Sequence, residues 1–294
     1  MTTIAQPAAQ SKRPVSRPKT PLPAGAWDCH AHVFGPFERF PLRAERRYEP
    51  PLAPAEDYLE MLDTVGFHLG VIVHASAKGF DMANVADALA RRSDRLVGVA
   101  VPAPDADDAA YAALHDQGFR AVRFTESGRH AGRSYGTLYF DDLERLAPRL
   151  REMGWHAQIW GRCDLVMAQR PALESYGIPL VFDHLAYVET VKGVRDDAFR
   201  SFLDWLSADD IYVKTTPIRV SKNAPAYPEA RPFYEALLKA APDRLLFGSD
   251  WPYLSLDDNP PDVGHLVDLL DLWTGDDVLR RKIFVDNPES LYRR

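Results

Sequence analysis

The sequence predicts a single (β/α)8 barrel of the α/β class, the fold also called a TIM barrel. Three observations support this prediction. The chain has 294 residues, close to the usual length of this fold. Eight short apolar segments alternate with segments of helical periodicity. The apolar segments are almost uninterrupted, which is typical of parallel strands buried on both faces. Eight such units predict closure into a barrel.

The strands are expected where these apolar segments lie. The first lies in Ala26–His32, and strands two to eight are expected at residues 69–74, 96–101, 119–124, 155–160, 180–183, 211–213 and 245–247. Apolar residues at helical spacing separate them, so we expect helices at residues 56–64, 82–92, 107–117, 141–153, 196–207 and 231–240. A loop rich in proline and arginine, residues 36–54, is long enough to form part of a lid.

The first 24 residues differ in composition from the rest. They contain five prolines among serine, lysine and arginine, and they lack the apolar segment of a secretory signal. We therefore expect residues 1–24 to form a flexible, proline-rich arm and residues 25–294 to form the barrel. The alternative is an arm that covers a neighbouring subunit. The protein could then be a homo-oligomer.

Composition excludes several classes of partner. The net charge of -7 argues against a nucleic-acid surface, and no apolar run is long enough to span a membrane. Two cysteines do not form a disulfide framework, which fits a cytoplasmic protein. An anionic ligand would have to meet a local basic pocket.

Polar residues follow seven of the eight expected strands. In (β/α)8 barrels the chemistry takes place at the carboxyl ends of the strands, so these residues are candidates for one site. In chain order they are His30, His32, His74, Ser76, Arg123, Arg129, Trp160, His184, Lys214, Arg219 and Asp250.

His30 and His32 are two residues apart on a strand, so both side chains face the barrel interior. Asp250, after the last strand, lies across the seam from them. A carboxylate beside imidazoles can activate water, which indicates hydrolysis. Asp183 precedes His184 by one residue, and we therefore expect its side chain to point away from the site and to be structural.

Six short motifs carry a resemblance to a known family. The chain resembles the amidohydrolase superfamily (amidohydrolase-related family 2), in the lactonase branch that includes 2-pyrone-4,6-dicarboxylate hydrolase. The resemblance covers nearly everything from residue 27 to 294. It implies hydrolysis of a small anionic lactone, with Asp250 as general base and His30, His32 and His184 polarising the carbonyl. The motifs are residues 28–36 (DCHAHVFGP), 47–48 (RY), 122–124 (VRF), 183–184 (DH), 248–252 (GSDWP) and 286–288 (DNP).

The resemblance also implies the residues that bind substrate. Arg123, Arg129, Arg219 and Tyr48 match groups that bind carboxylates, and Ser76 and Trp160 complete the expected pocket. Guanidinium groups bind carboxylate or sulfonate with two parallel hydrogen bonds.

The pocket departs from the family pattern at three positions, where Trp160 replaces a Tyr, Tyr187 an Arg and Lys78 a His. Hydrolysis of 4-sulfomuconolactone or a carboxymuconolactone is therefore an alternative, as is a metal-dependent decarboxylase of the same superfamily. Sugar-acid lactones fit three arginines less well.

The metal requirement is a separate question. Many superfamily members bind metal through a histidine on strand five, where this chain has Trp160, and strand four offers Arg123 rather than a bridging group. The site thus resembles the metal-free branch, and we expect no cofactor. A mononuclear zinc or manganese ion held by His30, His32, His184 and Asp250 is the alternative. Ser76 or Ser249 as a nucleophile is less favoured, because no Gly-x-Ser-x-Gly elbow is present.

Overall fold

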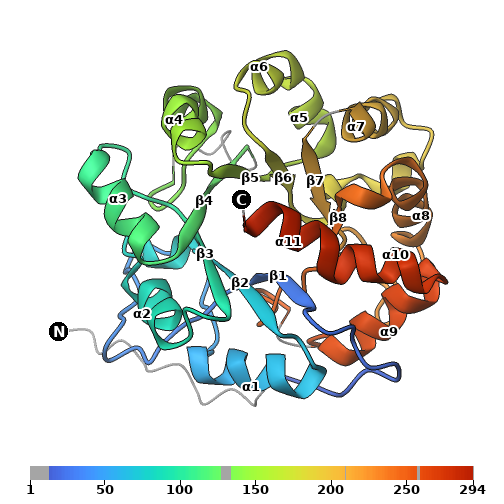
Figure 1. Cartoon of the computed structure of the whole chain (residues 1–294), viewed down its shortest axis with the longest axis horizontal. Coiled ribbons are helices and arrows are strands. Elements are labelled where there is room, and N and C mark those ends of the chain that lie inside the picture. Colours follow the sequence, from blue (N-terminus) through green and yellow to red (C-terminus); the bar gives the residue numbers. More distant parts are fainter. Residues whose placement is uncertain (1–12, 127–133, 209, 257–258, 294) are drawn as a thin grey trace.

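Eight parallel strands form the centre of the molecule, and helices surround them (Figure 1). The computed structural model describes residues 13–126, 134–208, 210–256 and 259–293. The strands pair in chain order, each with the next, which confirms the predicted (β/α)8 architecture. They are β1 (Trp27–Ala31), β2 (Leu69–Val73), β3 (Leu96–Ala100), β4 (Phe119–Thr125), β5 (His156–Trp160), β6 (Leu180–Phe182), β7 (Ile211–Lys214) and β8 (Leu245–Leu246).

The barrel closes between its last and first strands. The backbone N–H of Cys29 donates to the carbonyl of Phe247 at 2.9 Å, and the N–H of Asp250 donates to the carbonyl of His30 at 2.8 Å. These bonds continue beyond β8, which spans only two residues. Closure therefore places the segment after β8 directly beside His30.

The predicted helices are confirmed to within two residues at their ends. They form because their apolar residues lie on one face, which packs on the outside of the barrel. The α-helices are α1 (Ala55–Val65), α2 (Ala83–Arg91), α3 (Asp108–Asp116), α4 (Phe140–Glu152), α5 (Cys163–Met167), α6 (Arg170–Ser175), α7 (Asp197–Ala208), α8 (Arg231–Ala240), α9 (Val263–Thr274), α10 (Asp277–Arg281) and α11 (Asn287–Tyr292). Short 3-10 helices include η1 (Ser76–Lys78), η3 (His184–Tyr187) and η5 (Pro217–Arg219).

The last helix closes the amino-terminal end of the barrel. In Figure 1, α11 crosses the middle of the strand ring. Tyr292 stacks on Trp27 with ring centroids 5.5 Å apart, and the edge of His156 meets Tyr292 at 5.2 Å. His156 therefore lies at the end of β5 opposite the candidate site, as its position in the sequence predicts.

Residues 13–24 run along α9 and α10. The backbone N–H and Oγ of Ser16 donate to Asp262 Oδ1 at 3.2 and 2.7 Å, and the N–H of Lys19 donates to Asp268. The guanidinium of Arg280 donates to two carbonyls of the arm. This part of the arm is thus fastened to the barrel. The first 12 residues lie outside the described part of the chain, so a flexible arm and its boundary stay predictions.

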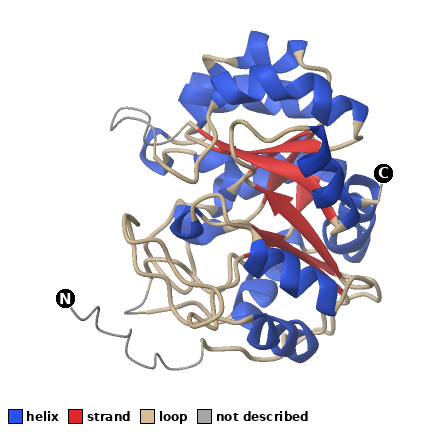
Figure 2. Ribbon diagram, turned by 90° about the vertical axis from the view of Figure 1, so that its left-hand side faces the viewer, coloured by secondary structure: helices blue, strands red, loops and turns tan. Residues whose placement is uncertain are grey.

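The loops that follow the strands gather at one end of the molecule, seen on the left in Figure 2. The expected lid, residues 36–54, lies among them. The Nζ of Lys78 donates to the carbonyl of Pro41 at 2.8 Å, and the N–H of Arg43 donates to the carbonyl of Ala77. The loop is therefore fixed against the loop after β2.

No helix in the described ranges is long and apolar enough to cross a bilayer.

Candidate active site

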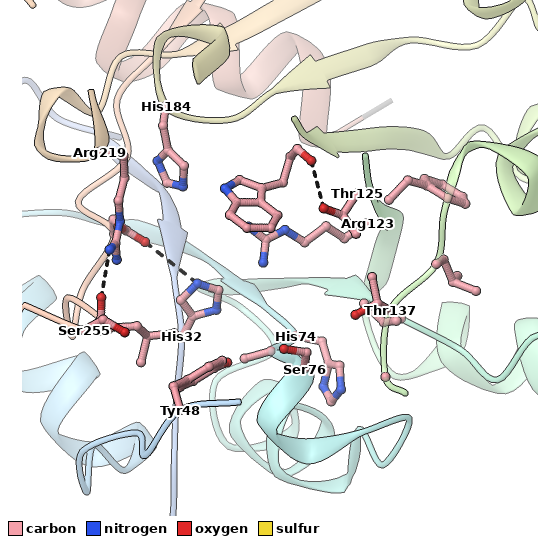
Figure 3. A pocket seen from close by; sticks show the side chains of 18 of the residues that line it. His32, Tyr48, His74, Ser76, Arg123, Thr125, Thr137, His184, Arg219 and Ser255 are labelled. Atoms are coloured by element: carbon pink, nitrogen blue, oxygen red, sulfur yellow. Dashed lines mark hydrogen bonds and ion pairs between the residues drawn. The ribbon is translucent and has the colours of Figure 1, made fainter. Parts of the chain in front are cut away.

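A cavity of about 240 Å³ opens at the carboxyl ends of the strands. Residues from the carboxyl ends of all eight strands or from the loops after them line it, among them His32, Arg123, His184 and Arg219 (Figure 3). Of the residues predicted from the sequence, these line it: His32, Tyr48, His74, Ser76, Arg123, Trp160, His184, Arg219 and Asp250. His30 lies directly beneath, and Arg129 falls outside the described residues.

His30 of β1 and His32, which directly follows β1, face each other inside the barrel. Their Nε2 atoms are 3.3 Å apart, and both side chains are almost fully buried. The Nδ1 of His32 lies 2.7 Å from the carbonyl oxygen of Val73, so Nδ1 carries the proton and Nε2 accepts. Burial lowers the pKa of His32 to about 3 and that of His30 well below its ordinary value, so both rings are neutral at pH 7.

Asp250 lies between these histidines and an arginine. Its Oδ1 is 3.7 Å from His30 Nε2 and 3.8 Å from His32 Nε2, while its Oδ2 accepts from Arg219 Nε at 2.5 Å. Burial alone would raise the pKa of Asp250. The Arg219 guanidinium outweighs that effect and holds the pKa of Asp250 below its ordinary value. Asp250 is therefore ionised, with Oδ1 directed at the histidines.

The backbone directs Asp250 and His184 into the site. Asp250 has φ 61 and His184 has φ 52, both in the left-handed region that residues with a Cβ rarely adopt. His184 Nδ1 has no hydrogen-bond partner among the described residues, and the His184 and His30 ring centroids are 4.8 Å apart. Burial lowers the pKa of His184 to about 4.

The prediction that Asp183 points away from the site is wrong. Its Oδ1 lies 3.2 Å from His30 Nδ1, and its Oδ2 accepts from Arg123 at 3.0 Å and from Gln158 at 3.2 Å. The alternation of side chains requires an extended backbone, but β6 ends at Phe182 and the chain turns left-handed at His184. Asp183 and His184 therefore both face the barrel interior.

The arginines of the cavity are already paired with carboxylates. Arg123 donates to Asp183, and Arg219 donates to Asp250 and, at 2.7 Å, to the carbonyl of Leu254. Both guanidinium groups are partly exposed to the cavity, so their remaining N–H groups can bind an anion. Hydrogen bonds thus connect the two arginines that can bind an anion to the carboxylates beside the histidines.

An aromatic and hydroxyl surface completes the cavity. Trp160 and Tyr187 meet edge to face with ring centroids 5.6 Å apart. The Tyr48 hydroxyl hydrogen-bonds the side chain of Ser76 and the backbone of Ala77, which places the lid loop at the cavity wall.

The sequence made Lys214 a candidate for the site without a specific role, and it assigned no role to Asp28 or Gln158. Asp28 accepts hydrogen bonds from the backbone N–H and Oγ of Ser249, both at 2.7 Å, and ties β1 to the segment after β8. Ser249 Oγ is therefore engaged in a structural contact, which counts against its use as a nucleophile. Gln158 and Lys214 surround Asp183, and only their inward positions on β5 and β7 could have indicated this.

The donor set fits a metal ion. His30, His184 and Asp250 offer ligand atoms within 4.8 Å of one another, and His32 Nε2 presents a lone pair 3.3 Å from His30 Nε2. Imidazole nitrogens with a carboxylate are the ligands that zinc prefers, and a carbonyl on Nδ1, as in His32, is typical of a metal-bound histidine. The residues thus permit a mononuclear zinc or manganese site.

Residues 27–294 match the family described as Amidohydrolase. The chain belongs to the amidohydrolase family. This amidohydrolase is 36% identical over 297 residues to 4-sulfomuconolactone hydrolase of Rhizobium radiobacter, covering 97% of this chain and 96% of that one. It is 33% identical to 2-pyrone-4,6-dicarboxylate hydrolase of Comamonas testosteroni, covering 94% and 93%.

Solved structures share the fold of this amidohydrolase. A Pseudomonas putida protein assigned to 2-pyrone-4,6-dicarboxylic acid hydrolysis superposes with a TM-score of 0.78 at 27% identity, covering 92% of this chain and 98% of that one. An amidohydrolase of Burkholderia multivorans with bound zinc has a TM-score of 0.67 at 14% identity, covering 92% and 99%.

Proposed function

We propose that this amidohydrolase opens a small anionic lactone by attack of a water molecule that Asp250 activates. The observation that carries the proposal is the position of Asp250, whose Oδ1 faces two buried histidines while Arg219 holds Oδ2. The relatives that match almost the whole chain in sequence are named as lactone hydrolases.

In the proposed reaction, water lies between Asp250 and the lactone carbonyl. Asp250 accepts a proton from the water as its oxygen attacks the carbonyl carbon. Imidazole N–H groups of His30 and His184 donate to the carbonyl oxygen as negative charge develops there. When the ring C–O bond breaks, Asp250 returns the proton to the leaving oxygen. No covalent enzyme intermediate is needed.

The cavity favours a substrate with one ring and at least one anionic group. Its volume of about 240 Å³ is below the usual range for drug-sized ligands. With neutral histidines, the cations Arg123, Lys214 and Arg219 outnumber the anions Asp183 and Asp250 by one. This excess attracts a carboxylate or sulfonate, as in 2-pyrone-4,6-dicarboxylate or 4-sulfomuconolactone. Tyr48, Ser76 and Trp160 would contact the rest of the ligand, and Arg129 is proposed as a further anion-binding residue.

His30, His32, His184 and Asp250 would hold a metal ion if the enzyme uses one. A bound zinc or manganese ion would polarise the carbonyl and lower the pKa of a bound water. The proposed mechanism needs neither effect, because Asp250 is ionised and the histidines can supply N–H donors.

The deciding experiment uses the purified, chelator-treated protein. It is incubated with 2-pyrone-4,6-dicarboxylate and, separately, with 4-sulfomuconolactone, and ring opening is followed by the loss of lactone absorbance. Turnover without added metal supports the Asp250 mechanism and identifies the substrate. Turnover only after zinc or manganese is restored would make this a metal-dependent hydrolase. No turnover of either lactone in any condition would contradict the proposed function.

The Asp250→Asn variant tests the general base. We expect kcat to fall by about 10²–10⁴-fold, because an amide cannot accept the proton from water. A matched control is Asp164→Asn, a surface carboxylate paired with Arg162, which should leave kcat unchanged. Circular dichroism verifies that both variants fold. An Asp250→Asn enzyme with kcat within a factor of three of wild type would remove Asp250 from its proposed role.

A further inference from the structure

A buried lysine lies beneath the candidate active site, and the proposed mechanism gives it no direct task. Lys214 ends β7, and its side chain is fully buried. Its Nζ lies 2.7 Å from Gln158 Oε1, 3.2 Å from His30 Nδ1 and 3.4 Å from Asp183 Oδ1. Burying a charged amine is costly unless it is fully paired, so these three contacts explain how the lysine is tolerated.

The contacts of Lys214 determine which nitrogen of His30 carries the proton. An ammonium group has three N–H donors and no acceptor, so His30 Nδ1 must accept where Lys214 meets it. A neutral imidazole has one N–H, which then belongs to Nε2. His30 Nε2–H donates in turn to His32 Nε2 at 3.3 Å, and His32 Nδ1–H donates to Val73. In this series of hydrogen bonds, each imidazole nitrogen of His30 and His32 is either a donor or an acceptor, without conflict.

The other tautomer of His30 would suit a different chemistry. If Nδ1 carried the proton, it would face Asp183 Oδ1 at 3.2 Å, as in metal sites where a carboxylate orients a ligand histidine. The two Nε2 lone pairs would then face each other at 3.3 Å and repel unless a cation lay between them. However, the contact between His30 Nδ1 and Asp183 Oδ1 falls outside hydrogen-bond geometry, and the same Oδ1 lies 3.4 Å from the Lys214 ammonium. The geometry favours the tautomer that Lys214 selects.

We propose that Lys214 is a positioning residue that holds His30 in the Nε2–H tautomer, and so keeps His30 and His32 from binding metal together. The same tautomer places the His30 N–H on Nε2, and in the proposed reaction this N–H would exchange its hydrogen bond to His32 Nε2 for one to the lactone carbonyl oxygen. The inference rests on the proposed function only for that last step, and its test needs no substrate.

The test compares wild-type protein with Lys214→Met, both full-length, chelator-treated and labelled with ¹⁵N-histidine. Long-range ¹H–¹⁵N spectra report the tautomer of each ring, and the His30 signals are assigned by their loss in His30→Gln. We expect Nε2–H in wild type and Nδ1–H in Lys214→Met. Titration with zinc alone, followed by calorimetry, should show at least about tenfold tighter binding by the variant, the size of effect that groups orienting ligand histidines have on metal affinity.

Gln158→Leu is the matched control. It removes another buried partner of Asp183 and Lys214 but leaves the contact between Lys214 and His30 in place. We expect it to keep the wild-type tautomer and zinc affinity. A wild-type His30 with the proton on Nδ1 would overturn the proposal, even if Lys214→Met fails to fold. So would a folded Lys214→Met with unchanged tautomer and zinc affinity. Neither readout depends on whether any lactone is hydrolysed.

Discussion

At the residue scale, two opposing effects act on the pKa of Asp250. Asp250 is buried, which favours its neutral form, and it touches Arg219, which favours its ionised form. A general base must be ionised, but a strongly stabilised carboxylate is a weak base. An anionic substrate that binds Arg219 would weaken the interaction of Arg219 with Asp250. The basicity of the Asp250 carboxylate would then increase. Binding and proton transfer would then be coupled through one side chain.

Replacing Arg219 tests this coupling. In Arg219→Met the carboxylate stays buried but loses its cation, so its pKa rises. The base is ionised above its pKa, and we therefore expect the acid limb of the kcat/KM profile to move to higher pH. KM should also rise about tenfold or more, because a charged hydrogen bond contributes roughly 1.5–3 kcal/mol. The measurement is kcat/KM and KM between pH 4 and 9.

Arg162→Met is the control for Arg219→Met. Arg162 pairs with Asp164 and Glu189 near the surface, with half of its side chain exposed. Its removal should leave the profile in place, because exposed ion pairs contribute little. If Arg219→Met kept the acid limb of wild type, Arg219 would have no influence on the base.

Sequence reasoning succeeded at residues whose environment is local. His30 lies on β1 and His32 directly follows it, and both face the barrel interior as the alternation of side chains predicts. Asp183 was misplaced because that alternation ends where β6 ends, and the left-handed turn at His184 has no signature such as glycine. The roles of Lys214 and Gln158 depend on partners from other strands and are not visible in the sequence.

At the element scale, the arm passes directly over α9 at Gly264. A Cβ on Gly264 would lie 2.3 Å from the carbonyl oxygen of Ser16, a distance that no real contact permits. Glycine inside a helix normally costs stability relative to alanine. Its presence in α9 is explained by the arm that passes over it.

Gly264→Ala should therefore release the arm. Alanine favours the helix itself, so any loosening reflects the clash with Ser16. We expect trypsin to cut the bond between Lys19 and Thr20 several-fold faster than in wild type, measured by mass spectrometry over time. Leu272→Ala changes an exposed position of the same helix and should leave the cleavage rate unchanged. Equal rates for Gly264→Ala and wild type would show that the arm is not held there.

At the scale of the whole molecule, buried neutral histidines make stability depend on pH. Burial lowers the pKa of His32 to about 3 and those of His74 and His184 to about 4, from an ordinary value of 6.5. Below pH 6.5 the unfolded chain binds protons that the folded protein does not. Protonation therefore favours unfolding, and stability falls as the pH drops from 6.5 to about 4.

We expect the free energy of unfolding to fall by roughly 1.4 kcal/mol per pH unit for each such histidine. Asp28 opposes this trend, because burial raises its pKa to about 6 and the folded state then binds a proton that the unfolded chain does not. The histidines outnumber Asp28, so the free energy of unfolding still increases with pH over this range. Urea unfolding at pH 7, 6, 5 and 4.5 measures the effect. His74→Gln should reduce the slope, and a stability that is flat or rises on acidification would contradict the assignment.

The sequence by itself determined the barrel, the order of its strands and the histidines and aspartate at their ends. These follow from apolar periodicity and from the rule that parallel strands end on one face, both of which are local properties of the chain. Only the tertiary structure decided the pairing of Arg219 with Asp250, the inward position of Asp183 and the contact of Lys214 with His30. These contacts join residues from different strands. They depend on barrel closure and on left-handed backbone at Asp250 and His184, which no periodicity encodes.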